Sequence, residues 1–215
     1  MKKLLLSACV AAITLGAANL ATASVLQTFG TGSAVVNASH SADFELNATL
    51  ANNYVENGLL LSYVGSDSNN NCGYAGVDCY DTPQELSPSF SGNYLATAGN
   101  NAYVSVRRAD GGNLYGIEWA AGSGYLTLNG YWKTFNDGVS TGAGNFDQSH
   151  GDVVGLFDAF GFDEVRYYAF SAPNRQSGFS SAAIDSVRAS DVPEPASTLL
   201  IGAALLGLSG LRRKR

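Results

Sequence analysis

Residues 102–120 read AYVSVRRADGGNLYGIEWA, and this stretch indicates the fold of the chain. Its first half alternates, so that Val104 and Val106 share one face of an extended strand while the residues between them take the other face. Asp110-Gly111-Gly112 then supplies residues that accept positive φ values, as the turn of a β-hairpin requires. A second apolar run follows over 113–120. Two short strands joined by a tight turn predict antiparallel β-structure.

The same organisation extends through the middle of the chain. Short apolar runs are separated by Gly, Asn, Asp and Ser, and no stretch keeps a helical period. We expect strands at 33–37, 42–50, 57–65, 102–108, 113–120, 124–132, 152–157, 164–170 and 181–189. Strands of this length and spacing predict an all-β fold, with a single β-sandwich or jelly-roll-like domain over residues 24–190.

The charge of this domain excludes one class of partner. The chain has 12 basic and 18 acidic residues, but six of the basic ones lie at its two ends. Residues 24–192 therefore hold 6 basic and 17 acidic side chains, a net charge of 6 − 17 = −11. A nucleic-acid-binding protein needs clustered Lys and Arg to displace counterions from phosphates. We therefore expect no nucleic-acid partner.

Residues 1–23 have the three parts of a secretory signal peptide. Lys2 and Lys3 form a positive start, residues 4–15 an apolar stretch, and Ala21-Thr22-Ala23 a small-x-small site before Ser24. We expect signal peptidase to cleave there and the protein to leave the cytoplasm. An uncleaved anchor helix is the alternative, although the apolar run is shorter than the roughly 20 residues that span a bilayer.

The C-terminal residues 191–215 have a second three-part arrangement. Pro193-Glu194-Pro195 is followed by the uncharged residues 196–211 and then by the basic end Arg212-Arg213-Lys214-Arg215. We expect residues 196–211 to form a short transmembrane helix, whose terminal cations stay on the cytoplasmic side. At about 1.5 Å per residue such a helix is roughly 24 Å long, thin for a permanent anchor.

This tail resembles the PEP-CTERM protein-sorting domain, which some classifications label the ice-binding protein C-terminal domain. The resemblance implies that Pro193, Glu194 and Pro195 are recognised by exosortase, a membrane cysteine transpeptidase of Gram-negative bacteria that make exopolysaccharide. It also implies transient residence in the inner membrane, and release to the cell surface or extracellular matrix after processing.

Residues 65–92 differ from the rest of the domain because they are polar and contain both remaining cysteines of the exported chain. Cys72 and Cys79 bracket six residues that include two glycines. In an exported domain, two such thiols most simply form a disulfide. Zinc is the rival interpretation, but two thiols without a nearby histidine make half a site.

No motif in the chain indicates catalysis. His40 and His150 are the only histidines, and neither belongs to a nucleophile or metal-ligand motif. A Ser-His-Asp triad assembled from distant residues stays open. A secreted hydrolase of polysaccharides is the alternative function, because paired carboxylates can hydrolyse glycosides. Its candidate carboxylates are Glu45, Glu56, Glu118 and Glu164.

A second resemblance concerns the middle of the chain. Asp43-Phe44-Glu45, residues 162–166 and Ile184-Asp185-Ser186-Val187 are similar to segments of jelly-roll modules of the carbohydrate-binding type. Such modules commonly place carboxylates of the first and last strands around a structural calcium. The resemblance implies that Asp43, Glu45 and Asp185 supply calcium ligands, which are hard oxygens.

The aromatic residues between 115 and 132 support a binding function. Exposed rings stack on the flat apolar faces of sugars. Tyr131 and Trp132 are the candidates for glycan stacking, with burial in the core or in cross-strand pairs as the alternative, whereas Trp119 is expected in the core. The sequence therefore predicts an exported, exosortase-sorted, non-catalytic protein, a structural or carbohydrate-associating component of an exopolysaccharide or biofilm matrix.

Overall fold

The computed structural model describes residues 25–46, 53–65 and 89–193. In these ranges the chain forms extended strands and one short 3₁₀ segment, η2 (Gln148–His150). The strands are β1 (Leu26–Phe29), β2 (His40–Ala42), β3 (Asn53–Glu56), β4 (Leu59–Val64), β5 (Leu95–Asn100), β6 (Tyr103–Arg108), β7 (Leu114–Ser123), β8 (Asn129–Asn136), β9 (Val139–Asp147), β10 (Val153–Phe162), β11 (Glu164–Ala169) and β12 (Phe179–Ser190).

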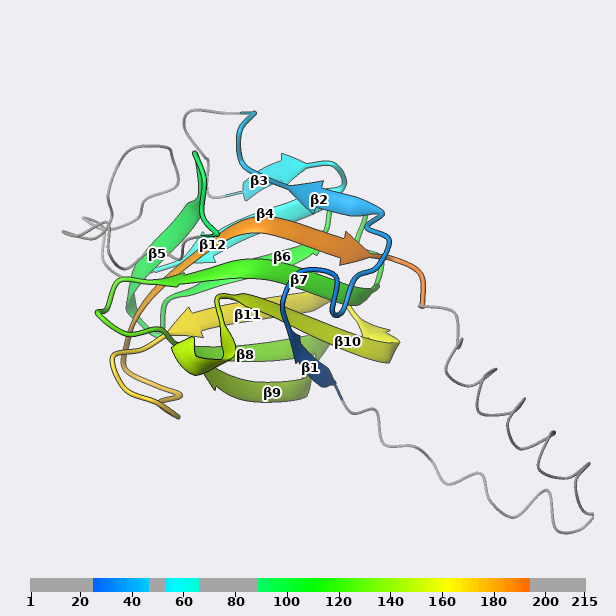
Figure 1. The fold of residues 1–215 in the computed structure, drawn as a ribbon. Coiled ribbons are helices and arrows are strands. Elements are labelled where there is room, and N and C mark those ends of the chain that lie inside the picture. The colour runs from blue at the N-terminus through cyan, green and yellow to red at the C-terminus, as the bar shows by residue number, and fades with distance from the viewer. Residues whose placement is uncertain (1–24, 47–52, 66–88, 194–215) are drawn as a thin grey trace, which may run out of the picture.

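The strands form two six-stranded antiparallel sheets that lie face to face (Figure 1). Sheet A has the order β1-β10-β7-β12-β2, and β5 also pairs with β12. Sheet B has the order β3-β4-β6-β11-β8-β9. The all-β prediction is confirmed, whereas the expected signal helix and sorting helix fall outside the described residues.

The core lies between the two sheets and is filled by alternate residues of each strand. Trp119 of sheet A is 2% exposed and packs against Tyr167 of sheet B, with ring centroids 5.8 Å apart. Val104 and Val106 belong to the same cluster, as their alternation predicts. Burial of these side chains is the main driving force for closing the sandwich.

A side-chain bridge ties β1 to sheet B. The indole nitrogen of Trp132 donates to Oε1 of Gln27 at 2.6 Å, and Nε2 of Gln27 donates to the carbonyl of Asn145 at 3.3 Å. Gln27 thereby satisfies the polar atom of a ring that is otherwise in the core. The first strand of the domain is thus held to β10 by its backbone and to sheet B by one amide side chain.

The turn at residues 109–113 does not close a hairpin. Gly111 adopts a φ of 78°, as expected of a tight turn, but β6 belongs to sheet B and β7 to sheet A. The turn therefore carries the chain from one sheet to the other. The hairpin prediction is wrong because alternation and turn residues specify a reversal of the chain but not the partner of each strand.

Several predicted strands are also wrong. Residues 33–37 form no strand, and residues 124–128 connect β7 to β8. Of the range 42–50, Ala42 ends β2, residues 43–46 form a turn, and the rest lies outside the described residues. Four strands were not predicted, namely β1, β3, β5 and β9. β9 lacks apolar alternation, since it is rich in Gly, Ser and Thr, and it is a strand because it pairs with β8.

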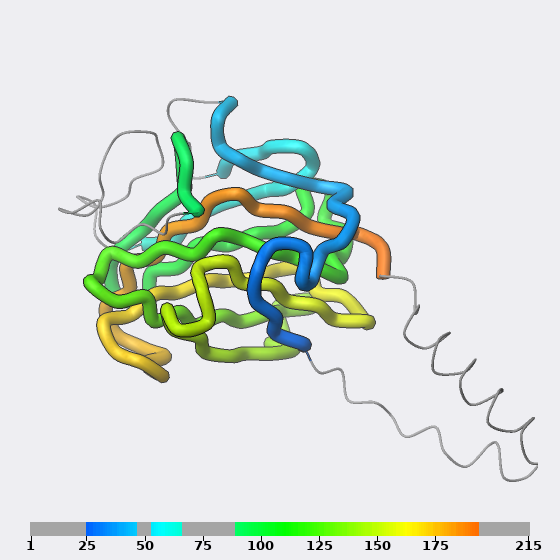
Figure 2. Tube along the Cα trace, viewed as in Figure 1, coloured from blue at the N-terminus to red at the C-terminus, as the bar shows by residue number. Residues whose placement is uncertain are grey.

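A loop covers part of the outer face of sheet A. Residues 30–39 follow β1 and pass over β7 before the chain enters β2 (Figure 2). The close approach requires a glycine beneath it, because a Cβ on Gly116 would lie 2.8 Å from the carbonyl oxygen of Ala34. The segment predicted as a strand at 33–37 is therefore a covering layer rather than a member of a sheet.

Candidate functional site

The two ends of the described domain leave it at the same place. Leu26 of β1 is in register with Phe157 of β10, Phe157 with Gly116 of β7, and Gly116 with Ser190 of β12. The start of the first strand and the end of the last therefore lie in one row across sheet A (Figure 1). The predicted sorting motif begins at this end of the domain.

The chain is fastened immediately before that motif. The carboxylate of Asp191 lies 3.4 Å from Nε2 of His40 and 3.7 Å from Nη1 of Arg108, and its backbone N–H donates to Oγ of Ser39 at 3.0 Å. A hydrogen bond with the Ser39 side chain holds the pKa of Asp191 below its usual value, and the nearby His40 and Arg108 act in the same direction. Pro193 is described, whereas Glu194 and Pro195 lie outside the described residues.

The carboxylates predicted to bind calcium are brought together in space. Asp185 is 1% exposed, and its oxygens accept from the backbone N–H groups of Ser91 at 2.9 Å and Ser186 at 2.6 Å. The pKa of Asp185 is raised to about 6, chiefly by burial and also by the negative charges of Glu45 and Asp43, while the hydrogen bonds from Ser91 and Ser186 act to lower it. The structure thus places all three carboxylates within electrostatic reach of one another.

The chemistry of these oxygen donors suits calcium, but their arrangement is not a ligand shell. Among the residues that the structure describes, no group of three or more His, Cys, Asp or Glu side chains is placed to hold one metal ion. Glu45 instead uses Oε1 to accept from the backbone of Asn93 at 2.8 Å. Calcium at Asp43, Glu45 and Asp185 therefore stays a prediction.

The raised pKa of Asp185 makes a pH dependence testable. Between pH 4 and pH 6 the folded protein keeps a proton that the unfolded chain has lost, so stability falls as the pH rises through this window. The shift from 3.8 to about 6 corresponds to at most about 3 kcal/mol. Chemical unfolding of wild type and Asp185→Asn at several pH values with a chelator isolates this effect, because the variant lacks it.

Calcium added at pH 7 should raise the unfolding midpoint of the wild type and leave that of Asp185→Asn nearly unchanged. A cation offsets the repulsion that the ionised Asp185 experiences. Identical pH profiles for the two proteins would contradict the assignment of the raised pKa. Identical calcium responses would contradict the calcium site.

The candidate catalytic carboxylate Glu118 serves as a fastening for the covering loop. Oε1 accepts from the backbone N–H groups of Ala34 at 2.6 Å and Val35 at 3.0 Å, while Oε2 accepts from Gly32 at 2.9 Å. Arg188 of the neighbouring strand donates to Oε2 at 2.9 Å. The side chain is 1% exposed. A buried carboxylate with four donors is a structural element of the fold.

The carboxylates of Glu164 and Glu56 are also engaged in contacts within the fold. Glu164 accepts from Oγ of Ser105 at 2.7 Å and forms ion pairs with Arg107 and Arg166. Burial acts to raise the pKa of Glu164, but the hydrogen bonds from Arg166, Ser105 and Arg107 outweigh it and hold the pKa below its usual value. Oε2 of Glu56 accepts from the backbone of Phe44 at 3.1 Å and from the hydroxyl of Tyr54 at 2.9 Å.

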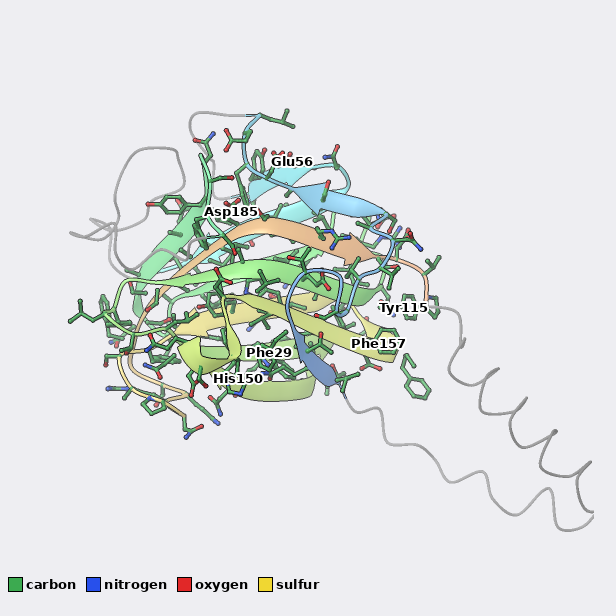
Figure 3. The ribbon with its side chains drawn as sticks, in the orientation of Figure 1. Phe29, Glu56, Tyr115, His150, Phe157 and Asp185 are labelled. Carbon is green, nitrogen blue, oxygen red and sulfur yellow. The ribbon has the colours of Figure 1, made fainter. Side chains whose placement is uncertain are left out.

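Neither histidine completes a Ser-His-Asp relay among the described residues. Nδ1 of His150 lies 3.0 Å from Asp147 and 3.4 Å from Oγ of Ser149, so both partners approach the same ring nitrogen. A relay needs them on opposite nitrogens. The ring of His150 stacks on Phe29, with centroids 4.5 Å apart (Figure 3). His40 contacts the carbonyl of Asn57 and the carboxylate of Asp191.

The aromatic residues proposed for glycan stacking are buried. Trp132 and Tyr131 are each 3% exposed. Trp132 belongs to the core between the sheets, whereas Tyr131 packs against Tyr168 with ring centroids 5.7 Å apart. Neither ring presents a face to a sugar in this conformation. The predicted stacking platform is therefore wrong at these two positions.

Exposed apolar side chains instead gather where β7 ends and β12 begins. Leu126 is 83% exposed and Phe179 is 45% exposed, and the hydroxyl of Tyr125 donates to the carbonyl of Phe179 at 3.1 Å. Burial raises the pKa of Tyr125, and the charge of Arg175 acts in the opposite direction, so Arg175 lies nearby. We call Tyr125, Leu126, Arg175 and Phe179 the distal loop surface.

The distal loop surface is not evident from the sequence, because the pattern predicts a strand over 124–132. Gly122-Ser123-Gly124 precedes Tyr125, and a cluster of Gly and Ser is typical of a strand end. The alternation of residues 125–129 concealed that indication. Leu126 points into solvent from the connection rather than into the core.

The predicted disulfide between Cys72 and Cys79 lies outside the described residues. No helix in the described ranges is long and apolar enough to cross a membrane. The sequence-based expectation of a span at 196–211 is outside those ranges as well.

The described domain is thus an all-β sandwich whose last strand leads directly into the C-terminal tail. A family model of the PEP-CTERM protein-sorting motif matches residues 191–214. The chain thus carries a PEP-CTERM sorting motif at its C-terminus, as its tail predicts, and the motif implies export, processing by exosortase and a surface or extracellular location. A search of curated proteins finds no match.

Solved structures give distant likenesses. The lectin domain of lectinolysin, complexed with Lewis B antigen, is 13% identical, with 61% of this chain and 92% of that chain covered and a TM-score of 0.38. A Ruminococcus gnavus fucosidase in complex with fucose is 8% identical, with 64% of this chain and 27% of that chain covered and a TM-score of 0.33. At these scores the likenesses support no conclusion about this chain.

Proposed function

We propose that the mature domain is a non-catalytic, structural or carbohydrate-associating component of the exopolysaccharide or biofilm matrix, built on a jelly-roll-like scaffold. The observation that supports it best is the distal loop surface. There, exposed apolar side chains lie beside the guanidinium group of Arg175. Figure 1 shows that β12 begins at the end of the sandwich opposite the one where the described chain leaves this strand.

The chemistry of the distal loop surface suits a polysaccharide. The ring of Phe179 and the side chain of Leu126 offer apolar area for the C–H faces of sugar rings. Arg175 uses Nε to donate to the carbonyl of Ser177 at 2.9 Å, which orients its remaining N–H groups. Those groups suit sugar hydroxyls or carboxylates.

The position of this surface suits a tethered protein. β7 runs for 10 residues from the end where the chain leaves to the distal loop surface, which at ~3.3 Å per residue is about 30 Å. A protein held at its C-terminal end therefore presents Leu126 and Phe179 away from its anchor. This geometry favours contact with extended polymers outside the membrane.

The carboxylates support the non-catalytic interpretation over the alternative of a polysaccharide hydrolase. Glu56, Glu118 and Glu164 are buried and accept hydrogen bonds that fasten loops and strands. Glu118 fastens a loop over the outer face of sheet A, and Glu164 pairs with arginines on the outer face of sheet B. Two catalytic carboxylates must instead flank one glycosidic bond.

Further expectations complete the proposal. We propose that signal peptidase releases Ser24 as the mature N-terminus, that Cys72 and Cys79 form a disulfide, and that calcium binds Asp43, Glu45 and Asp185. Sequencing the exported protein tests the first expectation. Thiol alkylation with and without reductant tests the second.

Binding to purified exopolysaccharide tests the function. We expect Phe179→Ser combined with Leu126→Ser to weaken binding about tenfold, or ~1.4 kcal/mol, because the apolar contact area is lost. Val139→Ser is the matched control, since Val139 is 68% exposed on the edge strand β9. Equal binding by all variants would overturn the assignment of the site. Release of reducing sugars, abolished by Glu164→Gln, would favour the hydrolase.

A further inference from the structure

A second group of exposed apolar side chains surrounds the place where the chain leaves the domain. Leu26 is 57% exposed, Phe160 60% and Val192 58%. Phe157 and Tyr115 are partly exposed, and Figure 3 shows both at the end where the chain leaves β12. We call Leu26, Tyr115, Phe157, Phe160 and Val192 the exit surface.

Strand register places the exit surface at one end of sheet A. Leu26 is paired with Phe157, and Phe157 with Gly116, the neighbour of Tyr115. Gly116 is paired in turn with Ser190, two residues before Val192. The backbone N–H of Phe160 donates to Oδ1 of Asp158 at 2.9 Å, which fixes the bulge that exposes the Phe160 ring. Apolar side chains of β1, β7 and β10, together with Val192 just beyond β12, thus lie at one end of sheet A and are partly or largely exposed.

The length of the tether brings this surface to a membrane. Pro193 is the last described residue, and the apolar stretch begins at Ala196. Three residues of extended chain reach at most ~11 Å. While the apolar stretch is in the bilayer, the exit surface must therefore lie within the headgroup region or against it.

The short length of the apolar stretch also favours contact between the exit surface and the membrane. The helix that the sequence predicts over residues 196–211 would be about 24 Å long at ~1.5 Å per residue, whereas the hydrocarbon core is about 30 Å thick. A short span draws its flanking residues toward the interface or thins the bilayer locally. Either adjustment pulls the end of β12 closer to the lipid.

We propose that the exit surface docks on the outer leaflet of the membrane that holds the precursor. This inference rests on the sorting function. Aromatic and aliphatic side chains at a protein end are suited to the interface between headgroups and acyl chains. Asp110 and Asp191, at the same end, both pair with Arg108, which reduces the cost of bringing them near lipid. Docking holds the sorting motif at the depth where a membrane enzyme acts.

Photo-crosslinking of the full-length precursor tests the docking in cells that lack exosortase. p-Benzoylphenylalanine replaces Phe160 in one variant and Leu26 in another, and it replaces Leu126 or Val64 in the controls, which lie at the opposite end of the sandwich. All four side chains are at least 48% exposed, so lipid can reach each of them if the membrane lies at that end of the domain. We expect phospholipid adducts at positions 160 and 26 to exceed those at 126 and 64 several-fold.

Equal lipid adducts at all four positions would overturn the docking, as would adducts at position 160 that contain protein instead of lipid. Either result leaves the sorting function intact, because that function is tested separately by processing of Glu194→Ala in cells that contain exosortase. As a second readout, Phe160→Asp should slow maturation several-fold, whereas Val64→Asp, at the opposite end of the sandwich, should mature at the wild-type rate.

Discussion

In cells that contain exosortase, the Glu194→Ala variant accumulates as a full-length, membrane-held precursor. A carboxylate between two prolines is a rigid, charged epitope, because each proline restricts the backbone on its own side. The apolar residues that follow contribute replaceable portions of an insertion free energy. We therefore expect Glu194→Ala to reduce maturation by more than tenfold, or ~1.4 kcal/mol of the barrier.

Leu205→Ala is the matched control and should mature almost normally, since one leucine supplies a small part of the insertion free energy. Removal of Arg212, Arg213, Lys214 and Arg215 should give intermediate processing, because the orientation of the span weakens. Gel mobility of the exported protein, with and without exosortase, measures all three. Equal maturation of Glu194→Ala and wild type would mean that the motif is not recognised.

Glu118→Ala should cost about 3–5 kcal/mol of the free energy of unfolding. The substitution removes the acceptor of three backbone N–H groups in the covering loop and of the Arg188 guanidinium. These donors are partly or fully buried, so each one that loses its partner keeps its desolvation cost. Glu118→Gln keeps one oxygen acceptor and should fall between alanine and wild type.

Asp110→Ala is the matched control for this loss. Asp110 also accepts from a backbone N–H, that of Gly112, and also pairs with an arginine, but its side chain is 62% exposed. Water replaces those contacts, so we expect an unfolding midpoint close to that of wild type. Urea unfolding of the exported proteins measures both variants. A Glu118→Ala midpoint equal to that of Asp110→Ala would contradict the structural role.

The sequence predicts those features of the fold that depend on neighbouring residues. Val104 and Val106 face the core, and Gly111 turns the chain with a positive φ, because alternation and backbone freedom are local properties. Pairing is not local. The partner of β6 across the turn could not be inferred, and β9 is extended because β8 lies beside it.

The same division applies to the candidate sites. The tail could be recognised because its motif, apolar stretch and basic end follow one another in the chain. Asp43, Glu45 and Asp185, which a resemblance grouped, lie within electrostatic reach of one another, and calcium binding there stays a prediction. Tyr131 and Trp132 were misjudged, since the burial of a ring depends on which face of its strand is covered. The distal loop surface joins residues 125 and 179, which are far apart in the sequence.

The place of β12 in sheet A sets the order of events during secretion. β12 pairs with β2, β5 and β7. β1 cannot pair until β10, more than 120 residues later in the chain, has also been exported. Sheet A therefore cannot close until nearly the whole chain has crossed the translocon. By then residues 196–211 follow immediately behind. Membrane insertion of the tail and closure of the sandwich thus become nearly simultaneous steps, and a chain truncated before Phe179 should be degraded rather than stored.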